Sequence, residues 1–161
     1  MFRTLLLCAV LLPLMGCGDD SNDPSGGNPD SGDPAKVTYA ESLGVDLSAM
    51  TLLPSGLYIQ DLGEPGTGAE AVSGAIVSVR YTGWLPNGTM FDSTENKAAF
   101  SFVLGRGSVI AGWDQGIAGM RVGGKRRLVI PSSLGYGRDG SPPRIPSYSV
   151  LVFDTELVAV R

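Results

Sequence analysis

Hydrophobic and polar residues alternate along residues 75–84, which is the clearest structural pattern in the chain. Val77, Val79 and Tyr81 fall on one side of this segment, and the positions between them are polar. Alternation with a period of two is typical of a β-strand that turns one face to a core. We therefore predict a strand over residues 75–84.

Further segments favour strands by their composition and periodicity, and they comprise residues 56–62, 90–92, 100–104, 126–130 and 149–160. Leu151, Phe153 and Leu157 share one side of the last of these segments. The turn sequence Pro86-Asn87-Gly88 separates the strand at residues 75–84 from the one that follows it. A chain of strands joined by turns predicts antiparallel pairing between neighbours.

One short helix is expected from Ile110 to Ala118. Trp113 and Ile117 lie four residues apart within it and so share one side of a helix. The 161 residues include 23 glycines and 11 prolines, a composition that favours many turns. These patterns predict an α+β domain, in which a half-open antiparallel β-sheet wraps around one short α-helix.

The first third of the chain is organised differently. Residues 37–54 hold scattered hydrophobic positions, so we predict an N-terminal extension on the edge of a domain formed by residues 55–161. Residues 18–36 contain almost no hydrophobic side chain, and such a segment buries too little surface to fold. Five acids and no base lie among residues 18–35. We interpret residues 17–36 as a flexible acidic linker.

Residues 1–16 resemble an export signal, in which Arg3 precedes a hydrophobic run from residue 5 to residue 15. The run is shorter than the about 17–25 residues of a membrane-spanning helix. It ends in Leu14-Met15-Gly16-Cys17, which resembles a bacterial lipobox. This predicts a lipoprotein signal peptide and lipidation of Cys17. An ordinary secretory signal with an incidental cysteine is the alternative.

Lipidation of Cys17 predicts an exported protein that is anchored to a membrane and faces the periplasm or cell envelope. Each buried CH₂ of an acyl chain contributes about 0.8 kcal/mol, and stable attachment needs more than one chain. Position 18 is Gly rather than Asp. In a Gram-negative bacterium this favours the outer membrane over the inner one.

The net charge of −4 is concentrated in the predicted linker, because eleven acids accompany ten bases from Val37 onward. A nearly neutral domain does not have the basic surface of a nucleic-acid-binding protein. The only basic run is Lys125-Arg126-Arg127. Strand alternation places Arg126 on the face opposite its two neighbours, and we interpret the run as a solvated strand edge.

The chain offers few reactive side chains. It contains no histidine and two cysteines, of which Cys8 lies in the predicted signal peptide and Cys17 follows it. The mature domain therefore has no disulfide, no thiol nucleophile and no cysteine ligand for a metal. Neither a metal nor a cofactor is predicted.

A series of short motifs resembles, in order and spacing, the FKBP-type peptidyl-prolyl cis-trans isomerases. The resemblance covers about residues 55–161, and although each motif alone is weak, the set is highly specific. The motifs are Val79-Arg80-Tyr81-Thr82-Gly83-Trp84, Gly88-Thr89-Met90-Phe91-Asp92-Ser93, Phe100-Ser101-Phe102-Val103-Leu104-Gly105, Val109-Ile110-Ala111-Gly112-Trp113, Gly119-Met120-Arg121-Val122-Gly123-Gly124-Lys125-Arg126, Ile130-Pro131, Gly135-Tyr136-Gly137, Ile145-Pro146 and Leu151-Val152-Phe153-Asp154-Thr155-Glu156-Leu157.

The resemblance implies a sheet of five or six antiparallel strands and a pocket between this sheet and the helix. Trp113 would form the pocket floor, and Phe102 is expected in the core instead. The walls and rims would be formed by Tyr81, Phe91, Phe100, Phe153, Val109, Ile110, Tyr136 and Ile145. The resemblance also implies proline-containing unfolded or exported polypeptides as substrates, and macrolide immunosuppressant-type compounds as further ligands.

Such a pocket suits a rotation about the Xaa-Pro bond. The barrier is roughly 18–20 kcal/mol because the planar amide is resonance-stabilised, and no bond has to break. An apolar pocket disfavours the charge-separated planar amide relative to the twisted one. The backbone N–H of Ile110 is expected to bind one substrate carbonyl, and the hydroxyl of Tyr136 a second one.

Asp92 is the one ionisable group expected inside the pocket, where the resemblance implies that it polarises the surroundings of the substrate carbonyl. A turn or cap residue after Phe91 is the alternative. Many family members carry an arginine a few residues later that pairs with this aspartate. Between Asp92 and Phe100 this chain has one residue fewer, and its only cation is Lys97, which lacks the bidentate fork of arginine. The sequence therefore does not identify an ion partner for Asp92.

The loop at residues 138–147 contains three prolines, and we interpret it as a flap over the pocket, although proline can also serve only to stiffen a loop. The leading hypothesis is a lipid-anchored isomerase that assists the folding of exported proteins. The alternative is a membrane-anchored peptide-binding chaperone with little or no turnover, since the same pocket would serve both. A purely structural lipoprotein does not explain the pocket residues.

Overall fold

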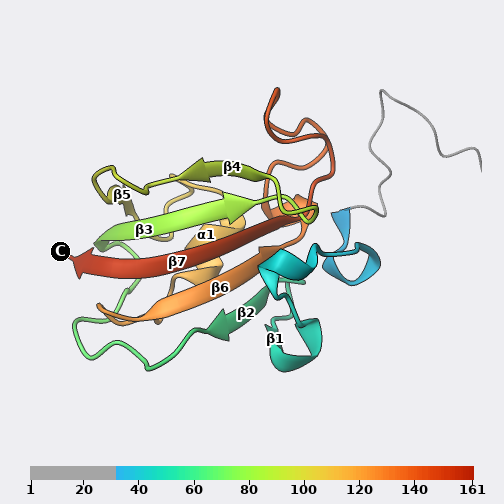
Figure 1. The fold of residues 1–161 in the computed structure, drawn as a ribbon. Coiled ribbons are helices and arrows are strands. Elements are labelled where there is room, and N and C mark those ends of the chain that lie inside the picture. Colours follow the sequence, from blue (N-terminus) through green and yellow to red (C-terminus); the bar gives the residue numbers. More distant parts are fainter. Residues whose placement is uncertain (1–31) are drawn as a thin grey trace, which may run out of the picture.

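The structure of the chain is a computed structural model that describes residues 32–161 (Figure 1). The predicted signal peptide, Cys17 and most of the predicted linker lie outside the described residues. Among the described residues, no helix combines the length and the apolar character that crossing a bilayer requires.

Seven antiparallel strands form one sheet, in the order β1-β2-β6-β7-β3-β4, with β5 also paired to β3. The predicted fold class is confirmed. The sheet has one strand more than the expected maximum, because the end of the extension pairs with β2 through Thr51 and Ile59. The strands are β1 (Thr51–Leu52), β2 (Tyr58–Asp61), β3 (Ile76–Trp84), β4 (Met90–Ser93), β5 (Phe100–Val103), β6 (Lys125–Ile130) and β7 (Leu151–Val160).

The helix α1 (Ala111–Gly116) packs on one face of the sheet, behind it in Figure 1. Two glycines allow this close approach. A Cβ atom on Gly112 would lie 2.5 Å from Cγ2 of Ile130, and one on Gly116 would lie 2.6 Å from Cδ2 of Leu128. The helix backbone therefore rests directly on β6. The helix is shorter at both ends than predicted, and it starts after Ile110 because this residue has an extended backbone with ψ 145°.

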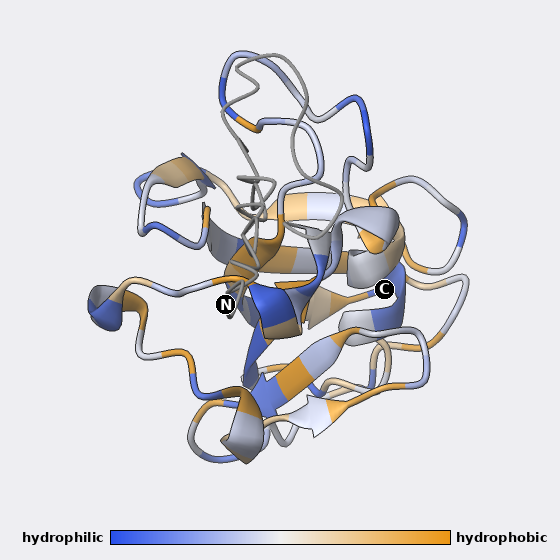
Figure 2. Ribbon diagram, turned by 90° about the vertical axis from the view of Figure 1, so that its right-hand side faces the viewer, coloured by the Kyte–Doolittle hydropathy of each residue, from blue (hydrophilic) through white to orange (hydrophobic). Residues whose placement is uncertain are grey.

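The main core lies between α1 and the sheet. Along the strands, hydrophobic positions alternate with hydrophilic ones (Figure 2), and the hydrophobic ones of the inner face enter this core. Phe102 belongs to it, with 7% of its surface exposed, as predicted. The fully buried side chains of the core include Leu57, Val77, Val79, Leu104, Ile117, Leu128, Ile130, Leu151 and Leu157.

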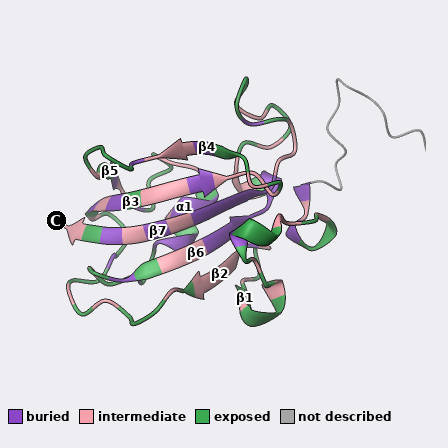
Figure 3. Cartoon of the chain, in the orientation of Figure 1, coloured by how far each residue is buried: buried purple, intermediate pink, exposed green. Residues whose placement is uncertain are grey.

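The N-terminal extension covers part of the outer face of the sheet. Leu43 is buried there against Val129, Val150 and Val152. As a result, the last three residues of β6 and the first three of β7 are buried without alternation (Figure 3). The end of the extension forms β1, which lies at the edge of the sheet beside β2. The extension also contains two short 3-10 helices, Glu41–Leu43 and Leu47–Ala49, and a third, Pro34–Lys36, directly precedes it.

Residues 32–36, which the sequence analysis assigned to the flexible linker, pack against the domain. Pro34 is buried, and its carbonyl accepts a 2.8 Å hydrogen bond from the hydroxyl of Tyr39. The side chain of Asp33 accepts a hydrogen bond from the backbone N–H of Ala35 at 2.9 Å. Proline and a capping aspartate thus order a segment that composition alone marks as polar.

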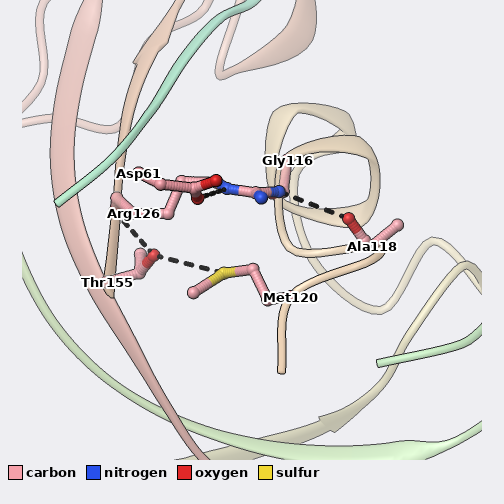
Figure 4. Close-up of polar contacts among 6 residues, drawn as sticks. All are labelled: Asp61, Gly116, Ala118, Met120, Arg126 and Thr155. Atoms are coloured by element: carbon pink, nitrogen blue, oxygen red, sulfur yellow. Dashed lines mark hydrogen bonds and ion pairs between the residues drawn. The ribbon is translucent and has the colours of Figure 1, made fainter. Parts of the chain in front are cut away.

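Arg126 connects β6 to the end of the helix (Figure 4). Its Nε donates to Oδ1 of Asp61 at 2.6 Å, and its Nη1 donates to the carbonyl oxygens of Gly116 and Ala118 at 3.0 and 3.4 Å. Carbonyls at the end of a helix lack partners within it, and a cation there is favourable. Thr155 donates to the carbonyl oxygen of Arg126 at 2.9 Å.

Arg127 projects from the opposite face of β6, as strand alternation predicted. Its guanidinium donates to both carboxylate oxygens of Asp154, at 2.6 and 2.8 Å, and to the carbonyl oxygen of Leu43. The hydrogen bond to Asp154 raises the pKa of Arg127 above its usual value. The side chains of Arg126 and Arg127 are only 13% and 14% exposed. The interpretation as a solvated edge is therefore wrong, because β6 lies between β2 and β7.

Because α1 contacts β6 so closely, a substitution that normally stabilises a helix should lower the stability of this protein. Gly112→Ala should lower the free energy of unfolding by roughly 1–3 kcal/mol, because the added methyl overlaps Ile130. In an exposed helix the same change stabilises by about 1 kcal/mol. Urea-induced unfolding followed by tryptophan fluorescence measures the difference.

The matched control is Gln115→Ala, since Gln115 is exposed on the same helix. This change should alter the free energy of unfolding by no more than about 0.5 kcal/mol. A Gly112→Ala protein that is as stable as the unchanged protein, or more stable, would contradict the packing described.

Candidate active site

A cavity of about 480 Å³ lies between α1, the sheet and the loop that follows β6. All ten residues that the sequence analysis placed in a pocket line this one cavity. They are Tyr81, Phe91, Asp92, Phe100, Val109, Ile110, Trp113, Tyr136, Ile145 and Phe153. The structure adds Ser108 and residues 141–144 to the lining. The residues come from β3, β4, β5, β7, the helix and two loops, so only the folded chain brings them together.

Trp113 occupies the floor of the cavity and is 4% exposed. Its ring meets those of Tyr81 and Phe153 edge to face, with centroid distances of 4.8 and 5.3 Å. Edge-to-face contacts between aromatic rings are favourable beyond the burial they provide. The indole N–H of Trp113 is buried and has no acceptor among the described residues. The floor is therefore a fixed aromatic surface with one unpaired donor.

Gly83 in β3 provides the space for the aromatic wall. A Cβ atom at this position would lie 2.7 Å from Cζ of Phe91 and 2.7 Å from Cε1 of Phe153. These two rings meet edge to face at a centroid distance of 5.4 Å. The two rings can therefore form this wall only because position 83 of β3 carries no side chain.

Asp92 lies within β4 and lines the cavity, so it is not a turn residue. Its Oδ2 accepts a 2.6 Å hydrogen bond from the hydroxyl of Tyr81, and its Oδ1 accepts one from the backbone N–H of Ser93 at 2.9 Å. Burial, followed by the hydrogen bond and the charge of Asp92, raises the pKa of Tyr81 well above its usual value. Tyr81 therefore stays protonated and holds the carboxylate in place.

Among the described residues, Asp92 has no ion partner. Lys97 donates to the carbonyl oxygen of Ser93 at 3.0 Å instead, and the ion pairs of the described part of the chain involve other acids. The cation that shares the cavity with Asp92 is Arg144. Its Nη1 donates to the carbonyl oxygen of Phe91 at 3.2 Å. Arg144 was not among the residues predicted from the sequence, since its only signal there is a position within the proline-rich loop.

The loop at residues 138–147 overhangs the cavity, as expected of a flap. The backbones of Ser141 and Ile145 exchange two hydrogen bonds, of 2.8 and 3.0 Å. Ile145 is 4% exposed and belongs to the main core. The flap is thus anchored by a buried side chain, while Pro142, Pro143 and Arg144 between the two bonded residues are exposed.

Backbone and hydroxyl donors stand on two rims of the cavity. Ile110 precedes the first turn of α1, and its carbonyl accepts from the N–H of Trp113 at 2.9 Å. Its own N–H has no acceptor among the described residues. Asp114 holds the preceding loop by accepting from the N–H groups of Gly105 and Gly107 at 2.8 and 2.9 Å. Tyr136 stands on another rim. Burial and the charge of Asp92 raise the pKa of Tyr136, so its hydroxyl keeps its proton.

The cavity is suited to binding a peptide rather than to nucleophilic attack on it. The cavity joins a large apolar surface to a few donors and one oriented carboxylate, and the chain contains no histidine. Among the described residues, no three acids or other ligating side chains gather into a group that would hold a metal ion. A site of this kind stabilises a particular shape of a bound peptide.

Residues 68–158 match the family described as FKBP-type peptidyl-prolyl cis-trans isomerase. The chain belongs to this family. The match spans all the cavity residues, from Tyr81 in β3 to Phe153 in β7, and the FKBP-type fold accounts for the open antiparallel sheet around one short helix.

Individual proteins of known sequence or structure give the same assignment. The chain is 51% identical to an FK506-binding protein of Neisseria meningitidis serogroup B over 106 residues, which cover 65% of this chain and 96% of that protein. It is 50% identical to FK506-binding protein 4 of Rhizopus delemar over 70% of this chain, but spans only 29% of that protein. The crystal structure of FkpA from Escherichia coli is similar with a TM-score of 0.65 and 37% identity, over 75% of this chain and 55% of that chain.

Proposed function

We propose that the chain catalyses cis–trans rotation about Xaa-Pro peptide bonds of unfolded or exported polypeptides and so assists their folding. The observation that carries this proposal is the cavity, in which a buried tryptophan floor is combined with an oriented carboxylate and with two rim donors, the N–H of Ile110 and the hydroxyl of Tyr136. Membership of the FKBP-type isomerase family supports it. Catalysis here requires no cofactor, since no bond is made or broken.

The proline ring packs on Trp113 between the rings of Tyr81, Phe91 and Phe153. Removal of the Xaa-Pro amide from water disfavours its planar, charge-separated form relative to the twisted form. Only contacts that are stronger in the twisted form increase the rate, and each tenfold increase needs about 1.4 kcal/mol. A few well-placed contacts in a dry cavity therefore suffice.

Polar groups at the rims orient the peptide. The unpaired N–H of Ile110 donates to the substrate carbonyl that follows the proline, and the hydroxyl of Tyr136 donates to a second carbonyl. Asp92, held by Tyr81, lies beside the carbonyl of Xaa and favours the orientation that this group takes in the twisted amide. Phe100, Val109 and Ile145 complete the surface on which the peptide lies.

A membrane-anchored chaperone that binds peptides with little turnover is the second candidate. It is favoured by one observation, the absence of an ion partner for Asp92 among the described residues. A carboxylate held by a single hydroxyl and one backbone N–H is less restrained than one in a bidentate ion pair. Turnover measurements separate the two candidates.

We also propose that the protein is an exported lipoprotein, attached to the membrane through Cys17 with the domain in the periplasm or cell envelope. The support is the sequence Leu14-Met15-Gly16-Cys17 after a short hydrophobic run. Macrolide ligands of the FK506 type are proposed to occupy the same cavity as the proline, since the Neisseria meningitidis relative is named for binding such a compound.

The isomerase proposal predicts a clear difference between two aromatic substitutions. Trp113→Leu should lower kcat/KM for a Leu-Pro or Phe-Pro peptide by about tenfold or more, because it removes the floor on which the proline packs. Phe102→Leu should lower it by less than about threefold, because Phe102 is buried but does not line the cavity. A protease-coupled assay on the purified protein measures both values.

Both substitutions remove aromatic packing, so the free energy of unfolding of each variant is measured in parallel. Equal losses of activity at equal stability would contradict the assignment of the pocket. A protein that binds unfolded polypeptide but does not accelerate the rotation would favour the chaperone.

The lipoprotein proposal predicts that Cys17→Ser moves the protein from the membrane fraction to the soluble fraction. Without the thiol no acyl chain is attached, and the hydrophobic run alone is too short to span the bilayer. Fractionation of expressing cells followed by immunoblotting measures the distribution, with Ser21→Ala as the control. Continued attachment of the Cys17→Ser protein would count against lipidation.

A further inference from the structure

We propose that Arg144 makes the pocket prefer an acidic residue over a neutral or basic polar residue immediately before the proline. This inference rests on the proposed function and adds the charge class of the substrate to it. It concerns the one charged side chain of the flap that lines the cavity.

Arg144 has unused hydrogen-bonding capacity. A guanidinium carries five N–H donors, and in the structure one nitrogen, Nη1, donates to the carbonyl oxygen of Phe91 at 3.2 Å. The ion pairs of the described residues do not include Arg144, and the side chain is exposed at the mouth of the cavity. The bond to the Phe91 carbonyl places the cation, while its remaining donors stay open to a carboxylate.

The other charge at the mouth does not neutralise this site. Asp92 already accepts hydrogen bonds from the hydroxyl of Tyr81 and from the backbone N–H of Ser93, and no ion pair joins it to Arg144 among the described residues. An arginine with free donors binds a carboxylate in a planar, bidentate geometry that neutral side chains do not reproduce. The partner that fits is therefore a glutamate or aspartate side chain of the peptide.

The position of Arg144 selects the residue before the proline. The Ile110 N–H takes the carbonyl that follows the proline, so the chain after the proline leaves over that rim. The Xaa carbonyl lies on the side of Asp92. Arg144 is hydrogen-bonded to the backbone carbonyl of Phe91, the residue directly before Asp92. The side chain of Xaa thus emerges beside Arg144.

The test compares Glu-Pro, Gln-Pro and Lys-Pro peptides of the form acetyl-Ala-Xaa-Pro-Phe-4-nitroanilide in the protease-coupled assay. An acetyl cap is used so that Xaa carries the only carboxylate. The Glu/Gln ratio of kcat/KM should be about twofold to fivefold, the range of an exposed ion pair, and should shrink in 0.5 M salt. Lys-Pro should be the poorest of the three.

Charge variants show whether Arg144 is the cause. In Arg144→Gln the Glu/Gln ratio should fall to about one, and in Arg144→Glu the order of Glu-Pro and Lys-Pro should reverse. A reversal is a readout that a merely structural role of the flap would not produce. The matched control is Arg138→Gln, since Arg138 is an exposed arginine of the same loop that does not line the cavity, and it should keep the ratio of the unchanged protein.

Failure of this inference differs from failure of the proposed function. If every peptide is turned over but the Glu/Gln ratio is about one, or persists in Arg144→Gln, the acidic preference is wrong and the isomerase proposal stands. If no peptide is turned over, titration of the same three peptides by calorimetry decides the preference from their affinities.

Discussion

The contact between the backbone of α1 and β6 is the constraint on which the site depends. Gly112 and Gly116 let the helix approach Ile130 and Leu128 more closely than any side chain would permit. Trp113, between the two glycines, is thereby brought down to the sheet, where Tyr81 and Phe153 hold its ring edge to face. A helix raised by one methyl group would lift the floor and open the cavity to water.

The proposed chemistry needs few reactive groups, and the cavity has few. Rotation about an amide requires a dry surface and a few oriented dipoles, and the cavity has a tryptophan floor, a carboxylate fixed by Tyr81 and the free N–H of Ile110. The rest of the molecule keeps these groups in place. Arg126 binds the end of the helix from the inner face of β6, and Arg127 binds the N-terminal extension from the outer face.

The sequence predicted most of the site because its motifs keep a family order, and all ten pocket residues do line one cavity. It failed where contacts are distant along the chain. Alternation placed Arg126 and Arg127 on opposite faces, but their partners Asp61 and Asp154 depend on strand order, which alternation does not reveal. Arg144 was missed for the same reason, since only the folded flap places it beside Phe91. The packing of Pro34 was hidden by the polar composition around it.

Rotation about the Xaa-Pro bond in this pocket requires no proton transfer. The most direct test is the solvent isotope effect on kcat/KM for an Xaa-Pro peptide, measured in H₂O and D₂O with the purified protein. The expected ratio is about 1, because neither Asp92 nor either tyrosine exchanges a proton with the substrate in the rate-limiting step. A normal isotope effect above about 2 would show that a proton is transferred in the rate-limiting step, and it would contradict catalysis by binding alone.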